Sequence, residues 1–210
     1  MQKLLWAFIG LMFTSAVVAE DWRALPPAFQ TEFRRLLPDV GFDLAKDKVT
    51  LRNRGGVLSV QETEDFSLSF TWRQKGGKDG DVLTVAYATD GNRSGSDRSF
   101  EVRKAIAIAF QAHAGEITIH RRDESQEKKE DRNIGLGGVP FKFERDKDYA
   151  VKITSSGRSI HIEIDGKTVL KGQVPLDFEP KKGHILVYNR EPYAGMVQET
   201  TLSSLELLLP

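Results

Sequence analysis

The stretch from Tyr149 to Asn189 constrains the fold more than any other part of the chain. It reads as four short strands, YAVKITS, RSIHIEI, KTVLKGQV and GHILVYN, with breaks at Ser156-Gly157 and Asp165-Gly166 and a longer loop before the last strand. Alternation of apolar and polar residues is the period of a strand with one buried face. Asp-Gly between two such runs is a strong hairpin signal. The pattern predicts consecutive antiparallel strands and hence an all-β fold.

The N-terminus predicts where the protein is located. Lys3 precedes the apolar run Leu4 to Phe13, and the small residues Thr14 to Ala19 follow. This is the three-part layout of a secretory signal peptide. The apolar run is shorter than the roughly 20 residues that span a bilayer, although an uncleaved membrane anchor is the alternative. We expect residues 1–19 to be removed and the mature protein to be periplasmic or extracellular, without a membrane span.

Composition narrows the classes of function. The 30 basic and 30 acidic residues cancel, so no overall field draws the protein to nucleic acid or anionic lipid. The chain has no cysteine, which excludes thiol catalysis and cysteine-bound metal. A domain of this length buries enough surface to fold without disulfides. We therefore expect one exported domain with no nucleic-acid partner.

The remaining sequence divides into a short helix and many strands. Pro26-Pro27 and the following AFQTEFRRLLPD predict a helix with an apolar side, Phe29, Phe33 and Leu36, inside an N-terminal strap spanning residues 20–47. From residue 48 to 210 the period is two, and the further strands are expected at 57–60, 66–72, 81–88, 98–103, 105–112, 116–121 and 202–208. Segments 74–80, 122–133 and 135–138 are predicted to be loops. Many short strands of this kind indicate a two-sheet antiparallel sandwich.

The order of the strands also carries a resemblance. RSFEVRKAIAIAF, a charged loop, YAVKITSSGRSIHIEIDGKTV, GHILVYNRE and a closing TTLSSLELL resemble the concanavalin A-like lectin/glucanase sandwich. Within it, the chain resembles the secreted bacterial modules related to the laminin-G-like and 3-keto-disaccharide hydrolase groups. The resemblance covers residues 48–210 and implies a jelly-roll fold. It is a pattern of strands, and fold alone does not establish an activity.

The sequence contains no complete catalytic constellation. Glycosidases need two carboxylates that flank the scissile bond. Glu163-x-Asp165 supplies half of the Glu-x-Asp-x-x-Glu strand of the sandwich glucanases, but Asp165 belongs to the hairpin turn and the third carboxylate is missing. Glu101 is the first alternative for a catalytic acid. We expect no cofactor, and the one metal site left open is a structural calcium at Glu62-x-Glu64-Asp65.

Several polar residues are candidates for a ligand-binding site. Sugar sites combine an aromatic face with planar hydrogen-bonding side chains. The candidates are Arg73, Glu101, Arg103, His120, Asn189, Arg190, Glu191 and Tyr193. Convergence of Arg73, Glu101, Arg103 and His120 on one face favours binding, whereas scattered ion pairs favour a structural role. Trp72 shares its strand face with apolar residues and is predicted to lie in the core.

Three functions remain after these arguments. The first is an exported, non-catalytic module that binds a carbohydrate or glycoconjugate. The second is a glycoside-active hydrolase of the 3-keto-disaccharide type, with Glu101 as its acid. The third is a structural or interaction protein of the cell envelope, for which the apolar side of the N-terminal helix would be the partner surface. The sequence favours the first.

Overall fold

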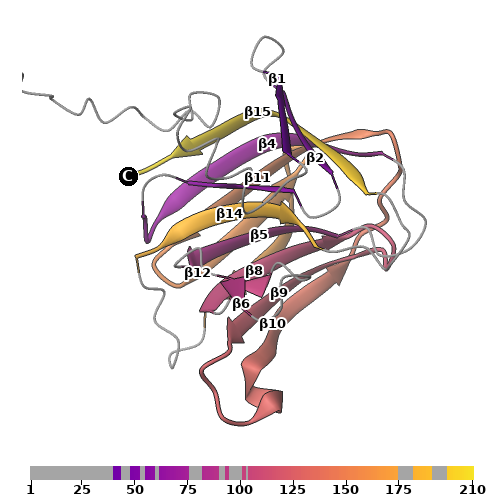
Figure 1. Ribbon diagram of the computed structural model, residues 1–210. Helices are drawn as coiled ribbons and strands as arrows, with labels where there is room; N and C mark the ends of the chain where they lie inside the picture. The colour runs from indigo at the N-terminus through magenta and orange to yellow at the C-terminus, as the bar shows by residue number, and fades with distance from the viewer. Residues whose placement is uncertain are drawn as a thin grey trace, which may run out of the picture.

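Two antiparallel β-sheets form the protein in the computed structural model, which describes residues 40–43, 48–52, 55–59, 62–75, 82–89, 93–94, 101–102, 104–174, 182–190 and 198–210. A seven-stranded sheet has the order β1-β2-β15-β4-β11-β12-β13, and a six-stranded sheet has the order β10-β9-β8-β5-β14-β3. The strands β14, β5, β8, β9 and β10 follow one another down the front in Figure 1. The predicted signal peptide and the predicted helix lie outside the described residues.

The strand bounds agree with the alternation in the sequence at most positions. The seven-stranded sheet consists of β1 (Val40–Asp43), β2 (Lys48–Arg52), β4 (Phe66–Lys75), β11 (Asp148–Ser156), β12 (Ser159–Ile164), β13 (Lys167–Gln173) and β15 (Glu199–Leu208). The six-stranded sheet consists of β3 (Gly56–Leu58), β5 (Val82–Thr89), β8 (Lys104–Gln111), β9 (Glu116–Asp123), β10 (Asn133–Pro140) and β14 (His184–Asn189). A small pair, β6 (Arg93–Ser94) and β7 (Glu101–Val102), completes the set. The prediction of a two-sheet antiparallel sandwich is confirmed.

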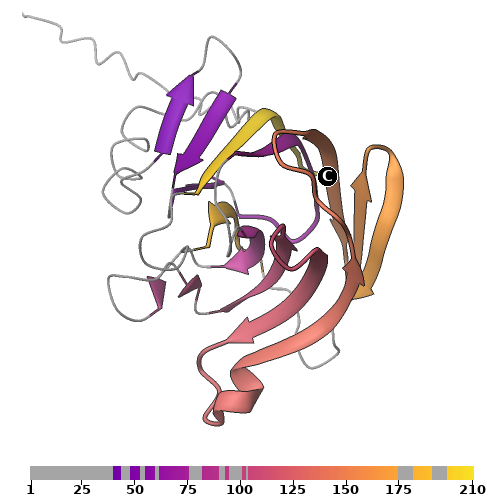
Figure 2. The ribbon, with the colours of Figure 1, turned by 90° about the vertical axis from the view of Figure 1, so that its right-hand side faces the viewer.

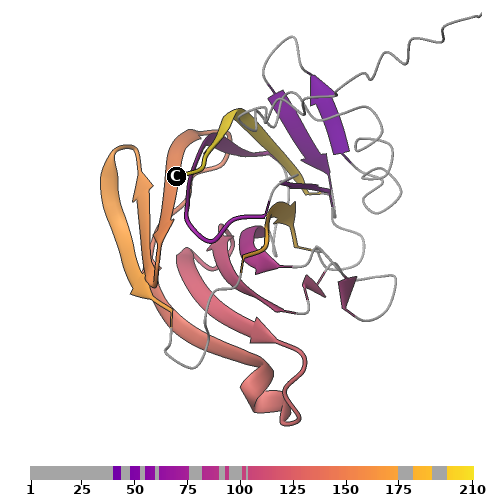
Figure 3. The ribbon, with the colours of Figure 1, turned by 90° about the vertical axis from the view of Figure 1, so that its left-hand side faces the viewer.

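The hydrophobic core lies between the two sheets. The seven-stranded sheet contributes residues such as Leu68, Phe70 and Trp72, and the six-stranded sheet contributes Ile106 and Ile108 among others, all buried. Trp72 is 1% exposed, and its ring centroid lies 5.7 Å from that of Phe110 on the opposite sheet, so its predicted place in the core is confirmed. Figures 2 and 3 show the two layers from the sides, with the orange β12–β13 hairpin beside the salmon β10.

The Asp165-Gly166 hairpin turn adopts the conformation that the sequence predicts. Both residues have positive φ, +51° and +72°, as a two-residue type I′ turn requires. The Asp165 carboxylate also accepts a hydrogen bond from the Ala150 N–H at 2.9 Å. Asp165 therefore has a structural role in the turn, as expected.

Strand β10 is a correction to the sequence prediction, which placed a loop at 135–138. Gly135, Gly137 and Gly138 are paired with β9 in an edge strand that carries a bulge between Gly135 and Gly137. The bulge breaks the two-residue period, and the glycines supply no side chains to reveal it. Pro140 is tolerated because it ends a strand at the edge of its sheet.

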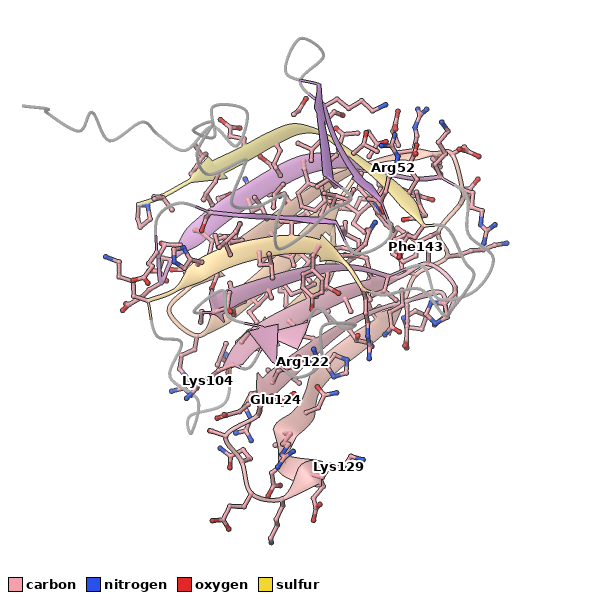
Figure 4. The ribbon with its side chains drawn as sticks, viewed as in Figure 1. Arg52, Lys104, Arg122, Glu124, Lys129 and Phe143 are labelled. Carbon is pink, nitrogen blue, oxygen red and sulfur yellow. The ribbon has the colours of Figure 1, made fainter. Side chains whose placement is uncertain are left out.

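The charged segment 122–133 forms a projecting arm between β9 and β10. Strand β9 continues as far as Asp123, and a short 3-10 turn, η3 (Lys129–Arg132), has no buried residue. Asp123 is buried and accepts hydrogen bonds from the Ser125 N–H at 3.1 Å and from Gln126 Nε2 at 3.1 Å. The arm extends beyond the sheets, with Lys129 near its tip (Figure 4).

No helix in the described part of the chain is long and apolar enough to cross a membrane.

Candidate functional site

Strand β9 directs a line of polar side chains away from the core. Its inward residues, such as Ile117 and Ile119, are buried against the other sheet. The alternate residues Glu116, Thr118, His120 and Arg122, called the β9 row from here on, are half-buried on the outer face. Period-two alternation alone produces this separation, because successive strand residues point to opposite faces.

Short side chains flank the β9 row on both neighbouring strands. On β8, Ala107 lies opposite His120 and Ala109 lies opposite Thr118. On β10, Gly135 and Gly138 occupy the positions next to the same two residues. An added Cβ at Gly138 would lie 3.2 Å from the Thr118 side chain, so the glycine keeps this place clear. Thr118 and His120 therefore project beyond the short side chains beside them, and on the β8 side Ala109 is half-buried whereas Ala107 is buried.

Hydrogen bonds hold the β9 row in a fixed arrangement. The Nε2 amide of Gln111, on β8, donates to Glu116 Oε1 at 2.9 Å and to Thr118 Oγ1 at 3.0 Å. His120 Nε2 lies 2.9 Å from the same Thr118 hydroxyl. These bonds use both amide protons of Gln111, yet leave its carbonyl oxygen, the second Glu116 oxygen and His120 Nδ1 without a partner in the described part of the chain.

The surroundings of His120 favour its neutral form. Burial lowers the pKa of His120, and the charges of Arg122 and Arg190 lower it further, whereas Glu116 raises it by less. A neutral imidazole presents one donor and one acceptor, both suited to a hydroxyl group. Arg190, directly after β14, is exposed, and its positive charge adds to that of Arg122 at His120.

The accessible part of this face lies over β9 and the adjoining ends of β8 and β10. Ala109 and Gln111 are half-buried, whereas Ala86 and Ala105, farther along the same face, are completely buried. Arg122 marks the front of this region in Figure 4. A ligand that reached the outer face would therefore contact the β9 row first.

Asn189 was predicted to bind a ligand, but its side chain points into the core. The residue is 0% exposed, its Nδ2 donates to the Leu51 carbonyl at 3.0 Å, and its Oδ1 lies 2.8 Å from the Thr200 hydroxyl. That hydroxyl is also 2.8 Å from Gln74 Oε1, and its single proton serves one of the two oxygens at a time. Asn189 joins the two sheets and cannot contact a ligand on the outer face, where the next residue, Arg190, is exposed.

Arg73 lies on the opposite side of the sandwich from His120. It projects from β4 of the seven-stranded sheet, where Nε and Nη2 each lie 2.6 Å from a carboxylate oxygen of Asp148. That bidentate bond lowers the pKa of Asp148. Arg73 and His120 therefore do not converge, since the hydrophobic core separates them, and the ion pair with Asp148 favours a structural role for Arg73.

The other predicted residues are only partly described. Glu101 is paired with Ser94 in the β6–β7 pair, which lies on the outer side of the six-stranded sheet in Figures 1 and 2. Its side chain, together with Arg103, Glu191 and Tyr193, lies outside the described residues, so the catalytic alternative at Glu101 stays a prediction.

The calcium site that the sequence leaves open at Glu62-x-Glu64-Asp65 stays an open alternative. Within the described ranges, no three acidic or histidine side chains lie close enough to hold a metal ion. At the predicted position, Glu62 is 3.6 Å from His184 Nε2, and Asp65 accepts a hydrogen bond from the Gly157 N–H at 2.6 Å. Both carboxylates thus have protein partners.

Comparison with known proteins identifies the fold. No family model matches the sequence, and no curated protein matches it. Among solved structures, the exoplasmic/lumenal domain of VIP36 in a Ca²⁺/Man3GlcNAc-bound form has a TM-score of 0.59 at 14% identity, with 82% of each chain covered. The carbohydrate binding module CBM66 from Bacillus subtilis has a TM-score of 0.56 at 10% identity, over 81% of this chain and 91% of the module. The carbohydrate recognition domain of Emp47p has a TM-score of 0.57 at 9% identity, over 80% and 85%.

The chain therefore shares its two-sheet sandwich fold with a carbohydrate binding module and two lectin-type domains, which agrees with the concanavalin A-like resemblance of the strand order. At these identities the likeness concerns the fold, and the function has to be argued from the site.

Proposed function

We propose that this protein is an exported, non-catalytic carbohydrate-recognition module that binds its ligand over the β9 row. The observation that carries the proposal is the hydrogen-bonded arrangement of Gln111, Glu116, Thr118 and His120 on an accessible face. It presents fixed acceptors and a neutral imidazole, while Arg190 adds a planar donor. Sugar hydroxyls both donate and accept, so they match such a mixed set. The fold is shared with a carbohydrate binding module and with carbohydrate recognition domains, which supports the same reading.

Because these side chains are already held in place before binding, the arrangement suits a polar ligand whose individual hydrogen bonds contribute little free energy. Each hydrogen bond to a sugar replaces one to water, so its net contribution is only about 0.5–1.5 kcal/mol. Immobilising a side chain on binding costs about the same amount. Because the β9 row is already held by Gln111, most of that cost is met during folding.

A glycan array followed by calorimetry tests the proposal. We expect the mature protein to bind a subset of glycans. His120→Ala and Thr118→Val should each weaken that binding about 3- to 10-fold, the equivalent of losing about one hydrogen bond. Arg73→Ala is the matched control, since it removes an exposed polar group from the opposite face and should leave the affinity unchanged.

Two outcomes contradict the proposal in different ways. Absence of binding to neutral, acidic and sulfated glycans at high protein concentration would exclude the function. Wild-type affinity in folded His120→Ala and Thr118→Val variants would exclude the site but leave the function open to another face.

Export rests on the N-terminal layout and has its own measurement. We propose cleavage after Ala19, so that the mature chain begins at Glu20. Intact-mass analysis of the protein recovered from the periplasm or medium should give the mass of residues 20–210. Recovery of the uncleaved chain from the cytosol would contradict export.

A further inference from the structure

A groove crosses the outer face of the seven-stranded sheet, on the opposite side of the molecule from the β9 row. Its volume is about 370 Å³, and its polar lining comes from Ser69, Thr71, Lys152, Glu163, Ser204 and Glu206. These residues belong to β4, β11, β12 and β15, four adjacent strands at the centre of the sheet. We call it the outer groove.

The strand register explains how a flat sheet acquires this depression. Glu163, Lys152, Ser69 and Glu206 are consecutive cross-strand neighbours and form one transverse line. In the next line, Ala150 is opposite Thr71, and Thr71 is opposite Ser203. Long charged side chains therefore border a floor of short ones. With strands about 4.8 Å apart, the two carboxylates at the ends of the line arise from positions roughly 14 Å apart.

A β-bulge in β15 directs Glu206 toward the groove. Leu202 faces the core, so strict alternation would place residue 206 in the core as well. The register instead shifts between Ser203 and Glu206, with Ser204 at a φ of +51°. Leu205 and Leu207 consequently stay buried while Glu206 is exposed. Bulges re-aim side chains in this way and are over-represented next to sites.

The charged groups of the outer groove are only partly engaged by the protein itself. The side chains of Lys152 and Glu206 make neither an ion pair nor a hydrogen bond within the described residues. Glu163 lies 3.8 Å from His161 Nε2, a contact on one side of its carboxylate. The groove thus offers one ammonium with three donors between two carboxylates with free acceptor positions.

This chemistry favours a neutral ligand with several hydroxyl groups. An anion at Lys152 would face carboxylates on both sides, and a cation between the carboxylates would face the ammonium. Neighbouring hydroxyls of a sugar ring can donate to a carboxylate and accept from the ammonium, while the methyl groups of Ala150 and Thr71 contact its C–H surface.

We infer that the outer groove is a second binding site, for a neutral glycan. It is independent of the β9 row because it belongs to the other sheet and shares no residue with that site. With sites facing in opposite directions, one molecule would hold two glycan chains at once.

Backbone amide chemical shifts of the uniformly ¹⁵N-labelled mature protein test this inference residue by residue. The probes are cellohexaose, laminarihexaose, mannohexaose and xylohexaose, titrated separately to millimolar concentration. We expect at least one of them to give saturable shifts centred on Ser69, Lys152 and Glu206. The double variant Lys152→Ala, Glu206→Gln should raise the dissociation constant of that probe tenfold or more.

The matched control carries the same changes on the projecting arm, Lys129→Ala with Glu124→Gln, and should bind as the wild type does (Figure 4). The shifts also separate this inference from the proposed function. Shifts confined to Thr118 and His120 would overturn the outer groove as a binding site and support the β9 row. Shifts confined to Ser69, Lys152 and Glu206 would support the outer groove and count against the β9 row. Wild-type affinity in the folded double variant, or no saturable shift with any of the four probes, would overturn the outer groove.

Discussion

Replacing Asn189 by alanine tests the role of the buried amide that joins the two sheets. The side chain bonds to the Leu51 carbonyl at 3.0 Å and lies 2.8 Å from the Thr200 hydroxyl, both within the core. Alanine removes both interactions and leaves a small void. We expect Asn189→Ala to destabilise the fold strongly while leaving the outer face of β14 unchanged.

The magnitude follows from the two hydrogen bonds. A typical bond contributes about 1 kcal/mol net, and a buried group that loses its partner costs about 1–3 kcal/mol. Thr200 keeps Gln74 as a partner, so only the Leu51 carbonyl is left buried without one. One lost hydrogen bond and one unsatisfied group together cost about 2–4 kcal/mol. For a domain of this size, each 1 kcal/mol lowers Tm by about 2–4 °C, which gives a decrease of about 4–16 °C.

Chemical denaturation and calorimetry of the mature protein measure this change. Thr200→Val removes the shared hydroxyl and should couple to Asn189→Ala in a double-mutant cycle by at least about 0.5 kcal/mol. Arg190→Ala, one residue away but exposed, should change stability by less than about 0.5 kcal/mol. If Asn189→Ala costs no more than Arg190→Ala, the amide does not stabilise the core and the reasoning fails.

Three further perturbations address other features. Gly183→Ala should cost about 1–3 kcal/mol by denaturation, because its Cβ would lie 2.7 Å from neighbouring backbone atoms, whereas Gly135→Ala, with no atom within 4 Å, should be nearly neutral; equal costs would contradict this. Arg73→Ala should leave the Tm nearly unchanged, since the Asp148 ion pair is exposed to solvent, and a large loss of Tm would contradict this. Burial raises the pKa of Asp123, but hydrogen bonds from its neighbours outweigh burial and lower it below the ordinary value. The ionised carboxylate therefore contributes stability that is present above about pH 4 and is lost as the pH falls through the lowered pKa, so the Tm difference between wild type and Asp123→Asn should shrink on acidification; a constant difference from pH 7 to pH 2.5 would refute it.

The sequence predicts most strands because their buried and exposed residues alternate. It also predicts the hairpin turn at Asp165-Gly166, where both residues have a positive φ. Strand β10 could not be read, because glycines and a bulge remove the periodic signal. The Arg73–Asp148 pair could not be read either, since β4 and β11 are neighbours in space but far apart in the chain.

The candidate site was found in part. His120 was predicted because it falls on the polar face of its strand, and Arg190 because it follows a buried strand. Asn189 was misplaced because β14 is buried on both faces, so that alternation gives no contrast there. Gln111 and Glu116 were missed, although the register of the β8–β9 hairpin places them directly opposite each other. Pairing strands across a predicted hairpin would have shown them.

The alternation of exposed and buried residues along β9 has a consequence for how the sequence of this protein can change. The even-numbered residues from 116 to 122 lie on the outer face, whereas Ile117 and Ile119 are buried in the core. Substitutions at these four positions therefore leave the buried residues in place, and the short neighbours of Thr118 and His120 leave room there for larger side chains. With the β9 row as the proposed binding site, substitutions at these positions would change the ligand that is bound while the free energy of unfolding changes little.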